Sequence, residues 1–547
     1  MFSRRTLALL AIAWLLFWTV LILQKHDSIG VGTLDGVHDV EPQDEAVYSN
    51  AAIRMATQGE WSTPYFLGRF FLYKPPLVYW LSAASVKVFG VSVWALRLPS
   101  ALAGALCLLI LVNWGRESDF QNILATMFLV GSGFFELTGR NLTDGPLTFC
   151  IALCCFVLAR DPALDKRFSQ VAFCVSTVAA ILLKSTAGLI PLLILGSFKL
   201  VRWRKASPNV GRASACAGLQ SRQSPPWLRI LAISTGSLLL AAPWFAYQYS
   251  IHPRWFWTEF VQVELLAYGT GAPPQQAAES AWKFYGSVLL NHYPMIAWVA
   301  PAALWGLAKA VRKREPDAVV VAVWIAVMSL AIVSFQYRNG TYLLPLCVAV
   351  AAANVYGERR LMMVSLVAGC FAWFLFWRIA AGSNQALGPG IVLNEFCEAG
   401  RQRELVIVDG IDNFHATVLP LHKVRYAFPG GGQPPKGFAL DFRSMGIVMP
   451  VAEFLDLEKH RPRYAAELRA WGLPNDEALA SVIAFQDTAD LGRLIRSSPD
   501  RDFLVPNRYD EVVRDLPDHD ATREGRFQML RAKRPVGTRP PARSCRM

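Results

Sequence analysis

A polar and aromatic stretch near the start of the chain carries the residues best suited to chemistry. It runs from Glu41 to Pro76, opens with the acidic pair Asp44-Glu45 and ends with Lys74 directly before two prolines. A carboxylate can act as general base on a hydroxyl group or orient an attacking acceptor. A lysine can hold a phosphate and stabilise it as a leaving group. One end of the stretch therefore suits an acceptor, and the other suits a phosphorylated donor.

Composition shows what kind of protein must position this stretch. The chain has 547 residues, of which 53% are hydrophobic and only 17% charged, against roughly 25% charged residues in soluble domains. Long apolar runs recur along the sequence, and they predict a polytopic α-helical membrane protein. The net charge of +13 does not indicate nucleic acid, because the basic residues sit in short loops between apolar runs. Most of the 10 Cys fall within apolar runs and show no zinc spacing.

The first apolar run, Thr6–Leu23, is interpreted as an uncleaved span rather than a signal peptide, because it is long and no small-x-small cleavage site follows it. Arg4 and Arg5 before it place the N-terminus in the cytoplasm, so residues 25–96 form a first outer loop. Within that loop we expect a helix over residues 45–58 with Asp44 as its N-cap, and a helix over residues 75–88 lying at the membrane interface.

Further apolar runs bring the expected total to about eleven or more spans, at residues 97–113, 120–138, 145–159, 168–183, 186–201, 227–247, 286–308, 317–334, 341–356 and 361–380. With the N-terminus inside, Lys and Arg concentrate in the cytoplasmic loops, as the positive-inside rule requires. An odd number of spans leaves the C-terminal region outside. We therefore predict a transmembrane domain over residues 1–381 and an outer, periplasmic domain over residues 382–547.

The C-terminal domain has a different composition, with fewer apolar runs and more Gly, Pro and charged residues. Residues 404–409, 481–485 and 527–530 are typical of strands, and residues 451–471 and 490–497 of helices. This pattern predicts a soluble α/β domain.

Several polar residues fall at the predicted outer ends of spans or in outer loops. Charged residues at membrane depth are costly and usually serve a site, so we expect a cavity that opens outward. Any one of them has a simpler explanation: Asp44 can cap a helix and Lys184 can extend its ammonium group to the interface. The set is Asp44, Glu45, Lys74, Arg140, Asp144, Lys184, Glu264, Arg338 and Tyr342.

These motifs resemble the membrane glycosyltransferases of GT-C fold, above all the lipid A aminoarabinose transferases, with the protein O-mannosyltransferases as more distant kin. The first loop carries the resemblance through Asp44-Glu45, GEW at 59–61, YKPPLVYW at 73–80 and RLPSALAG at 97–104. Weaker matches follow in order, at LTDGP 142–146, LKS 183–185, APW 242–244, QVE 262–264 and RNGTYLLP 338–345. The resemblance covers about residues 1–380.

The resemblance implies an enzyme that moves a sugar from a polyprenyl-phosphate donor to an acceptor outside the membrane, with inversion of the sugar's configuration. It implies a catalytic role for Asp44, donor-phosphate binding by Lys74, and a cavity lined by Arg338 and Tyr342. From the polar set above, we also expect catalytic roles for Glu45 and Asp144 and donor-phosphate binding by Arg140, Lys184 and Arg338. The substrate cavity would include Tyr48, Trp61, Tyr73, Glu264 and Tyr342.

Three departures from the aminoarabinose transferases concern substrate and metal. Tyr73 stands where they have Glu, Leu265 where they have His, and Val47 where they have Arg. Because the first two positions are associated with a metal in that family, we expect no such metal site and no cofactor here, although a divalent metal elsewhere stays open. The departures also leave the sugar and the acceptor open.

The expected location is the bacterial inner membrane, with the active site facing the periplasm. The expected partners are a polyprenyl-phosphate sugar, membrane lipids and an acceptor such as lipid A, lipopolysaccharide or another glycan, and no nucleic acid. The alternatives are a protein O-glycosyltransferase, a polyprenyl-lipid flippase or transporter, and an assembly protein with a periplasmic binding domain. A transporter does not explain the polar first loop, and the inverted repeats common in transporters are not evident.

Overall fold

The computed structural model describes residues 42–66, 69–91, 93–114, 129, 134, 138–206, 226–267, 280–335, 338–358, most of 360–371, 404–408, 424–429, 457–470, 482–485, 487–524 and 527–533. The predicted first span and nearly all of the span predicted at 120–138 lie outside these residues. The chain divides into two compact units. One contains the described residues within 100–247 and 264–379, and the other contains those within 21–99, 248–263 and 380–547. The domain boundary predicted at residue 381 stays a prediction.

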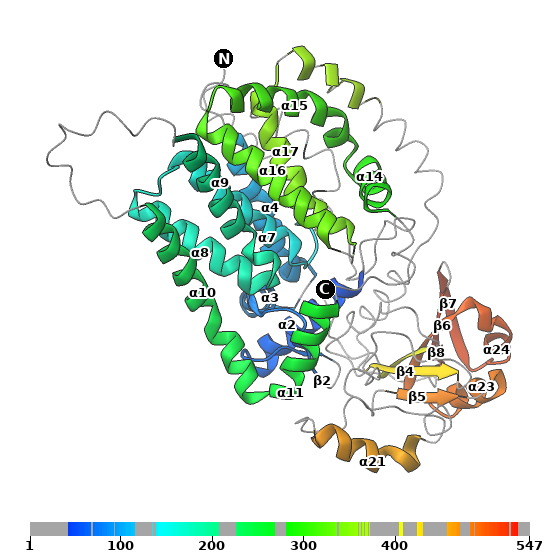
Figure 1. Ribbon diagram of the computed structural model, residues 1–547. Coiled ribbons are helices and arrows are strands. Elements are labelled where there is room, and N and C mark those ends of the chain that lie inside the picture. Colours follow the sequence, from blue (N-terminus) through cyan, green and yellow to red (C-terminus); the bar gives the residue numbers. More distant parts are fainter. Residues whose placement is uncertain are drawn as a thin grey trace, which may run out of the picture. The chain divides into compact units, whose positions relative to one another are not determined.

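Helix α7 (Asp144–Arg160) is the central helix of the first unit. Thirteen of its 17 residues are buried, and it packs against α8 (Arg167–Lys184), α9 (Ile190–Ala206), α16 (Pro316–Ser334) and α17 (Leu344–Ala353) (Figure 1). Its sequence is apolar all round, which is typical of a helix surrounded by other helices or by lipid. The two ends of α7 carry its charged residues, Asp144 and Arg160.

Four helices among the described residues are long and apolar enough to cross a membrane: α4 (Val93–Val112), α8, α10 (Pro226–Ile251) and α16. The segment predicted as one span at 286–308 is not one straight helix, because it forms α14 (Ala281–His292) and α15 (Pro294–Arg312), bent by 108°. Proline disfavours helical backbone in the residue before it, and Tyr293 before Pro294 leaves the helical region, with φ −128° and ψ 46°. The predicted total of spans stays a prediction.

The segment predicted as the first outer loop contains α2 (Pro42–Gln58), the short hairpin β1 (Tyr65–Phe66) and β2 (Arg69–Phe70), and α3 (Leu77–Phe89). Both predicted helices are therefore present, and α2 packs against α3. The prediction of Asp44 as an N-cap is wrong, because the helix begins at Pro42. Asp44 and Glu45 lie in its first turn instead, where the helix dipole favours negative charge.

The C-terminal residues form a six-stranded mixed sheet in the order β5-β4-β3-β6-β8-β7. The three predicted strands are confirmed as β3 (Glu404–Val408), β5 (Val482–Phe485) and β8 (Phe527–Ala532). The predicted helices are confirmed as α21 (Leu457–Ala470) and α23 (Thr488–Arg496). Three strands and one short helix were missed, β4 (Val424–Pro429), β6 (Arg501–Pro506), β7 (His519–Glu524) and α24 (Asp510–Arg514).

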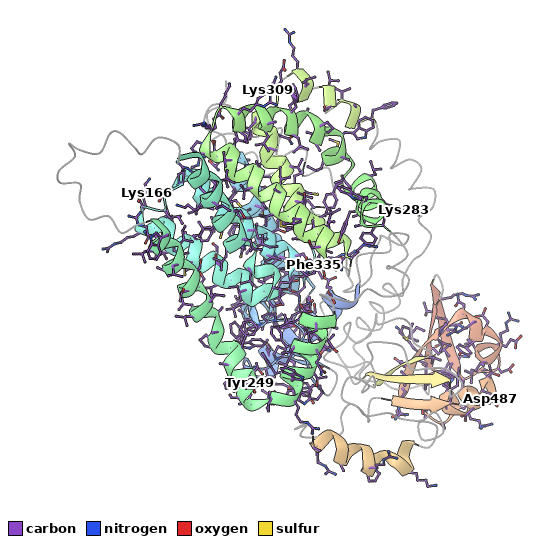
Figure 2. All side chains as sticks on the ribbon, viewed as in Figure 1. Lys166, Tyr249, Lys283, Lys309, Phe335 and Asp487 are labelled. Carbon is purple, nitrogen blue, oxygen red and sulfur yellow. The ribbon has the colours of Figure 1, made fainter. Side chains whose placement is uncertain are left out.

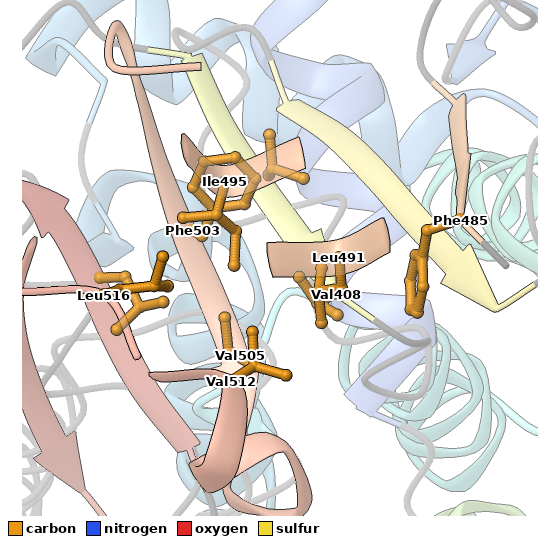
Figure 3. Close-up of a cluster of buried hydrophobic side chains, with 10 residues drawn as sticks. Val408, Phe485, Leu491, Ile495, Phe503, Val505, Val512 and Leu516 are labelled. Atoms are coloured by element: carbon orange, nitrogen blue, oxygen red, sulfur yellow. The ribbon is translucent and has the colours of Figure 1, made fainter. Parts of the chain in front are cut away.

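The sheet is parallel from β5 to β6, and β8 and β7 extend it antiparallel. Its hydrophobic core joins strands to α23, with Leu491 of α23 against Val408 of β3 (Figure 3). The α/β character of the segment is thus as predicted, and its place on the outer face stays a prediction.

Candidate functional site

Asp44 has a hydroxyl partner one helical turn away. The hydroxyl of Tyr48 donates to Oδ2 of Asp44 over 3.2 Å, as the i, i+4 spacing on α2 allows. The Tyr48 ring is only 1% exposed and meets the ring of Tyr79 of α3 edge-on, with centroids 5.5 Å apart. Packing against α3 thus fixes the hydroxyl, and the hydroxyl orients a carboxylate that remains partly exposed.

Glu45 has a different task from its neighbour. Its two carboxylate oxygens accept from Arg97, over 2.7 Å from Nε and 3.0 Å from Nη2, and both residues are 1% exposed. This bidentate ion pair joins α2 to the start of α4. The predicted catalytic role does not fit this arrangement, because an oxygen already bound to a guanidinium is a poor proton acceptor. We assign Glu45 to positioning α2, and Arg97 is a residue that the sequence reading missed.

The segment between α2 and α3 is held by polar side chains from elsewhere in the same unit. Trp80 Nε1 donates to the carbonyl of Trp61 over 2.7 Å, and Gln248 Nε2 donates to the carbonyl of Ser62 over 2.7 Å. Glu259 accepts from the backbone N–H of Leu72 over 2.7 Å. Gln248 and Glu259 are fully buried, so these contacts are shielded from water and strong. They fix a loop that lacks long secondary structure.

Lys74 follows two residues after the Leu72 contact. Pro75 and Pro76 restrict the backbone after it, and its side chain is half-buried. The neighbouring Tyr73 packs on the Phe71 ring, with centroids 4.9 Å apart. The glutamate hydrogen bond and the prolines therefore constrain the backbone on both sides of this lysine and fix the position from which its side chain extends.

An aromatic cluster covers the hairpin of the same loop. The Phe70 ring lies 3.9 Å from the His252 ring and 5.8 Å from the Trp255 ring, measured between centroids. Arg54 of α2 stacks over the Tyr65 ring at 3.7 Å. Burial lowers the pKa of His252, so its neutral imidazole is favoured within the cluster.

The first unit brings together three of the predicted site residues. Lys184 Nζ, at the end of α8, lies 2.8 Å from Oδ1 of Asp144, at the start of α7. The same ammonium group lies 4.5 Å from the centre of the Tyr342 ring. The two charged side chains are 12% and 9% exposed. A carboxylate at a helix start and an ammonium at a helix end both complement the helix dipoles, so the pair is stabilised locally.

Arg140, Arg338 and Glu264 are the other charged residues predicted for the site. Arg140 is buried in the turn before α7, and Arg338 is half-buried before the 3₁₀ helix η3 (Gly340–Leu343). Glu264 is half-buried on the π-helix η2 (Phe256–Ala267).

In the part of the chain that the structure describes, no three His, Cys, Asp or Glu side chains gather as metal ligands would. The sequence reading selected Glu264 on η2 and missed Glu259, the acid that holds the loop.

Comparisons with known proteins give these sites a context. The protein-family model of dolichyl-phosphate-mannose–protein mannosyltransferases matches residues 73–215. The undecaprenyl phosphate-α-4-amino-4-deoxy-L-arabinose arabinosyl transferase of Shewanella sediminis is 25% identical over 331 residues, 57% of this chain and 55% of its own. The corresponding Pseudomonas aeruginosa LESB58 protein is 27% identical over 368 residues, 63% of this chain and 58% of its own. The chain thus spans little more than half the length of these relatives.

The solved structures show how far the fold extends. ArnT from Cupriavidus metallidurans bound to undecaprenyl phosphate superposes with a TM-score of 0.63, at 14% identity, over 95% of this chain and 97% of ArnT. Its apo state gives a TM-score of 0.59 over the same shares. The chain therefore has the GT-C fold of ArnT and is a relative of the aminoarabinosyl transferases and the protein mannosyltransferases.

Proposed function

We propose that this protein is an inner-membrane glycosyltransferase that takes a sugar from a polyprenyl-phosphate donor and transfers it to an acceptor at the periplasmic face. The observation that carries the proposal is the first outer loop. It keeps an oriented, partly exposed Asp44 and a constrained Lys74 in a chain with the fold of a protein solved with undecaprenyl phosphate. Sequence relatives named as arabinosyl transferases support the same reaction.

The reaction follows from the two side chains. Asp44 orients an acceptor hydroxyl and takes its proton as the oxygen attacks the anomeric carbon. The bond from that carbon to the phosphate oxygen breaks, and the polyprenyl phosphate leaves with the electron pair. Lys74 stabilises the charge that develops on this phosphate. Attack and departure on opposite faces of the carbon invert its configuration.

Lipid A or the lipopolysaccharide core is the proposed acceptor class, because the first loop resembles the lipid A aminoarabinose transferases and two similar proteins are named as aminoarabinosyl transferases. A protein hydroxyl is the second candidate, favoured by the match of residues 73–215 to the protein mannosyltransferase family. Donor-phosphate binding by Arg140, Lys184 and Arg338 stays a prediction, and Lys184 already has a carboxylate partner in Asp144.

The test is a reconstituted transfer assay. The purified full chain in liposomes receives undecaprenyl phosphate-linked 4-amino-4-deoxy-L-arabinose or mannosyl-phosphoundecaprenol with lipid A or a serine-rich peptide, and released undecaprenyl phosphate is measured. We expect acceptor-dependent release with one pair. Movement of the donor between leaflets without release in any combination would instead identify a flippase.

Variants then assign the residues. Asp44→Asn should lower turnover by about 10²–10⁴-fold, the usual contribution of a general base. Lys74→Ala should lower it by roughly 10²–10³-fold, as for other groups that stabilise developing charge. The matched controls are Asp515→Asn and Lys313→Ala, which change exposed residues of the same types. Full activity in a well-folded Asp44→Asn or Lys74→Ala protein would refute the assignment.

A further inference from the structure

A group of basic side chains lies where α7 and α9 end and where α8 and α10 begin. All of these helix termini belong to the first unit. This basic cluster consists of Lys166, Arg167, Lys199, Arg202 and Arg229. Lys166 and Arg167 begin α8 and are exposed (Figure 2 labels Lys166). Helices α7 and α8 run from this end to the Asp144–Lys184 pair. At 1.5 Å per residue, the 17 residues of α7 separate the two ends by about 25 Å.

The cluster is assembled by specific contacts rather than by chance exposure. Arg229 of α10 forms an ion pair with Asp165 in the loop between α7 and α8. Lys199 of α9 donates to the carbonyl of Ala163 in the same loop over 3.4 Å. The charges of Arg202 and Arg229 both act on Lys199. Helices α9 and α10 therefore bring Lys199 and Arg229 to one loop, with Arg202 near Lys199, although like charges repel one another.

The loop itself is rigid enough to hold this arrangement. Asp161 accepts from the backbone N–H of Asp165 over 3.1 Å and from that of Lys166 over 3.0 Å. Leu164 adopts a positive φ of 56° and is buried. The carboxylate of Asp161 is thus used in closing the turn. Asp161 and Asp165 offset part of the charge of the five cations, and the described cluster keeps an excess of positive charge.

Exposed apolar side chains lie directly beside the cations. Phe168 follows Arg167, Leu200 follows Lys199, and Leu228 precedes Arg229, and all three are exposed. On α8 the exposed positions continue one turn further at Val171 and then at Val175, a spacing that keeps them on one face of a helix. Cations next to an apolar helix face complement an anionic phospholipid. Its phosphate would lie against the cations, and its acyl chains would lie along the apolar face.

We propose that the basic cluster binds the headgroup phosphate of an anionic phospholipid at the membrane surface opposite the Asp144–Lys184 pair. Basic pockets between membrane helices on the cytoplasmic side are suited to such headgroups, and the positive-inside pattern assigns this end of the helices to the cytoplasm. Lys199, Arg202 and Arg229 would contact the phosphate. This site is independent of the proposed glycosyl transfer.

The test compares lipids on the delipidated full chain in detergent. Retention of dioleoyl-phosphatidylglycerol and of dioleoyl-phosphatidylcholine is measured by native mass spectrometry, together with the melting temperature in each lipid. We expect selective retention of phosphatidylglycerol and a higher melting temperature with it. The triple variant Lys199→Gln/Arg202→Gln/Arg229→Gln should lose the selectivity. Each single change should weaken retention about fivefold, as expected for a cation near an anionic surface.

The controls separate the possible outcomes. Lys313→Gln and Arg312→Gln change exposed cations on another predicted cytoplasmic loop, the one between α15 and α16, and should leave the selectivity intact. Arg202→Gln guards against misfolding, because the Arg202 side chain is exposed and packs over the Phe198 ring. Equal retention of both lipids by the native chain would overturn the proposal, and so would unchanged selectivity in the triple variant. Competition by soluble glycerol phosphate at the same concentration as the lipid would also overturn it, by identifying a free-phosphate site.

Discussion

Asp44 and Glu45 are adjacent in the chain, but we expect a substitution of Asp44 to reduce turnover and a substitution of Glu45 to reduce stability. The Glu45 carboxylate and the Arg97 guanidinium form two charged hydrogen bonds of 2.7 and 3.0 Å, and each side chain is 2% exposed. Removing one partner leaves an uncompensated buried charge, which costs about 3–5 kcal/mol of stability. Glu45→Gln and Arg97→Met should therefore lower the unfolding free energy by this amount.

The double variant Glu45→Met/Arg97→Met sharpens the test. Hydrophobic side chains of similar volume often replace a buried ion pair at little cost, so the double variant should be more stable than either single one. Asp44→Asn should instead unfold like the native chain and lose turnover. The measurements are denaturant or thermal unfolding in detergent and turnover per folded molecule. A Glu45→Gln protein with native stability but no turnover would refute this division of roles and restore the catalytic reading of Glu45.

Three more predictions follow from single contacts. Glu259→Gln weakens the hydrogen bond to the Leu72 N–H and should lower the unfolding free energy by about 1–3 kcal/mol. It should also reduce turnover, and combining it with a Lys74 substitution should cost less turnover than the sum of the two single losses. Additive losses of turnover would show that the two residues act independently. Gly306→Ala should destabilise the fold, because a Cβ there would meet a backbone oxygen at 2.1 Å. A Cβ at Gly196 would meet nothing within 4 Å, so Gly196→Ala should stabilise the fold by about 0.5–1 kcal/mol. Thermal unfolding of the two variants tests this difference. Burial lowers the folded-state pKa of His252, so the unfolding free energy should fall as the pH drops from about 6.5 through that pKa. The His252→Phe variant should lose this pH dependence, which unfolding at several pH values would measure.

The sequence predicted the elements of the first loop better than their contacts. The period of apolar residues located α2 and α3 closely, because each has a buried face against the other. The exact start of α2 was not predictable, since Asp44 and Pro42 are both acceptable near a helix start. The partners of Glu45 and Leu72 lie 52 and 187 residues away. Pairings over such separations leave no local pattern.

The missed strands have a physical explanation as well. Strand β7 reads His-Asp-Ala-Thr-Arg-Glu and lies at the edge of the sheet, where side chains need not be apolar. Strand β6 is central and buried over four consecutive residues, so it shows no alternation. The bend at Pro294 was readable from the proline, yet an apolar run on both sides favoured one continuous span. Hydropathy alone cannot distinguish a straight helix from a broken one.

The two ends of helices α7 and α8 differ in their charge. Their length of about 25 Å is close to the roughly 30 Å of a bilayer's hydrocarbon core. One end carries a nearly buried, neutralised pair, Asp144 and Lys184, and the other carries exposed cations such as Lys166 and Arg167. The Asp144–Lys184 pair carries no net charge, whereas the five cations of the basic cluster outnumber the two carboxylates of the adjoining loop, Asp161 and Asp165. An anionic headgroup should therefore prefer the end of the helices that carries the basic cluster.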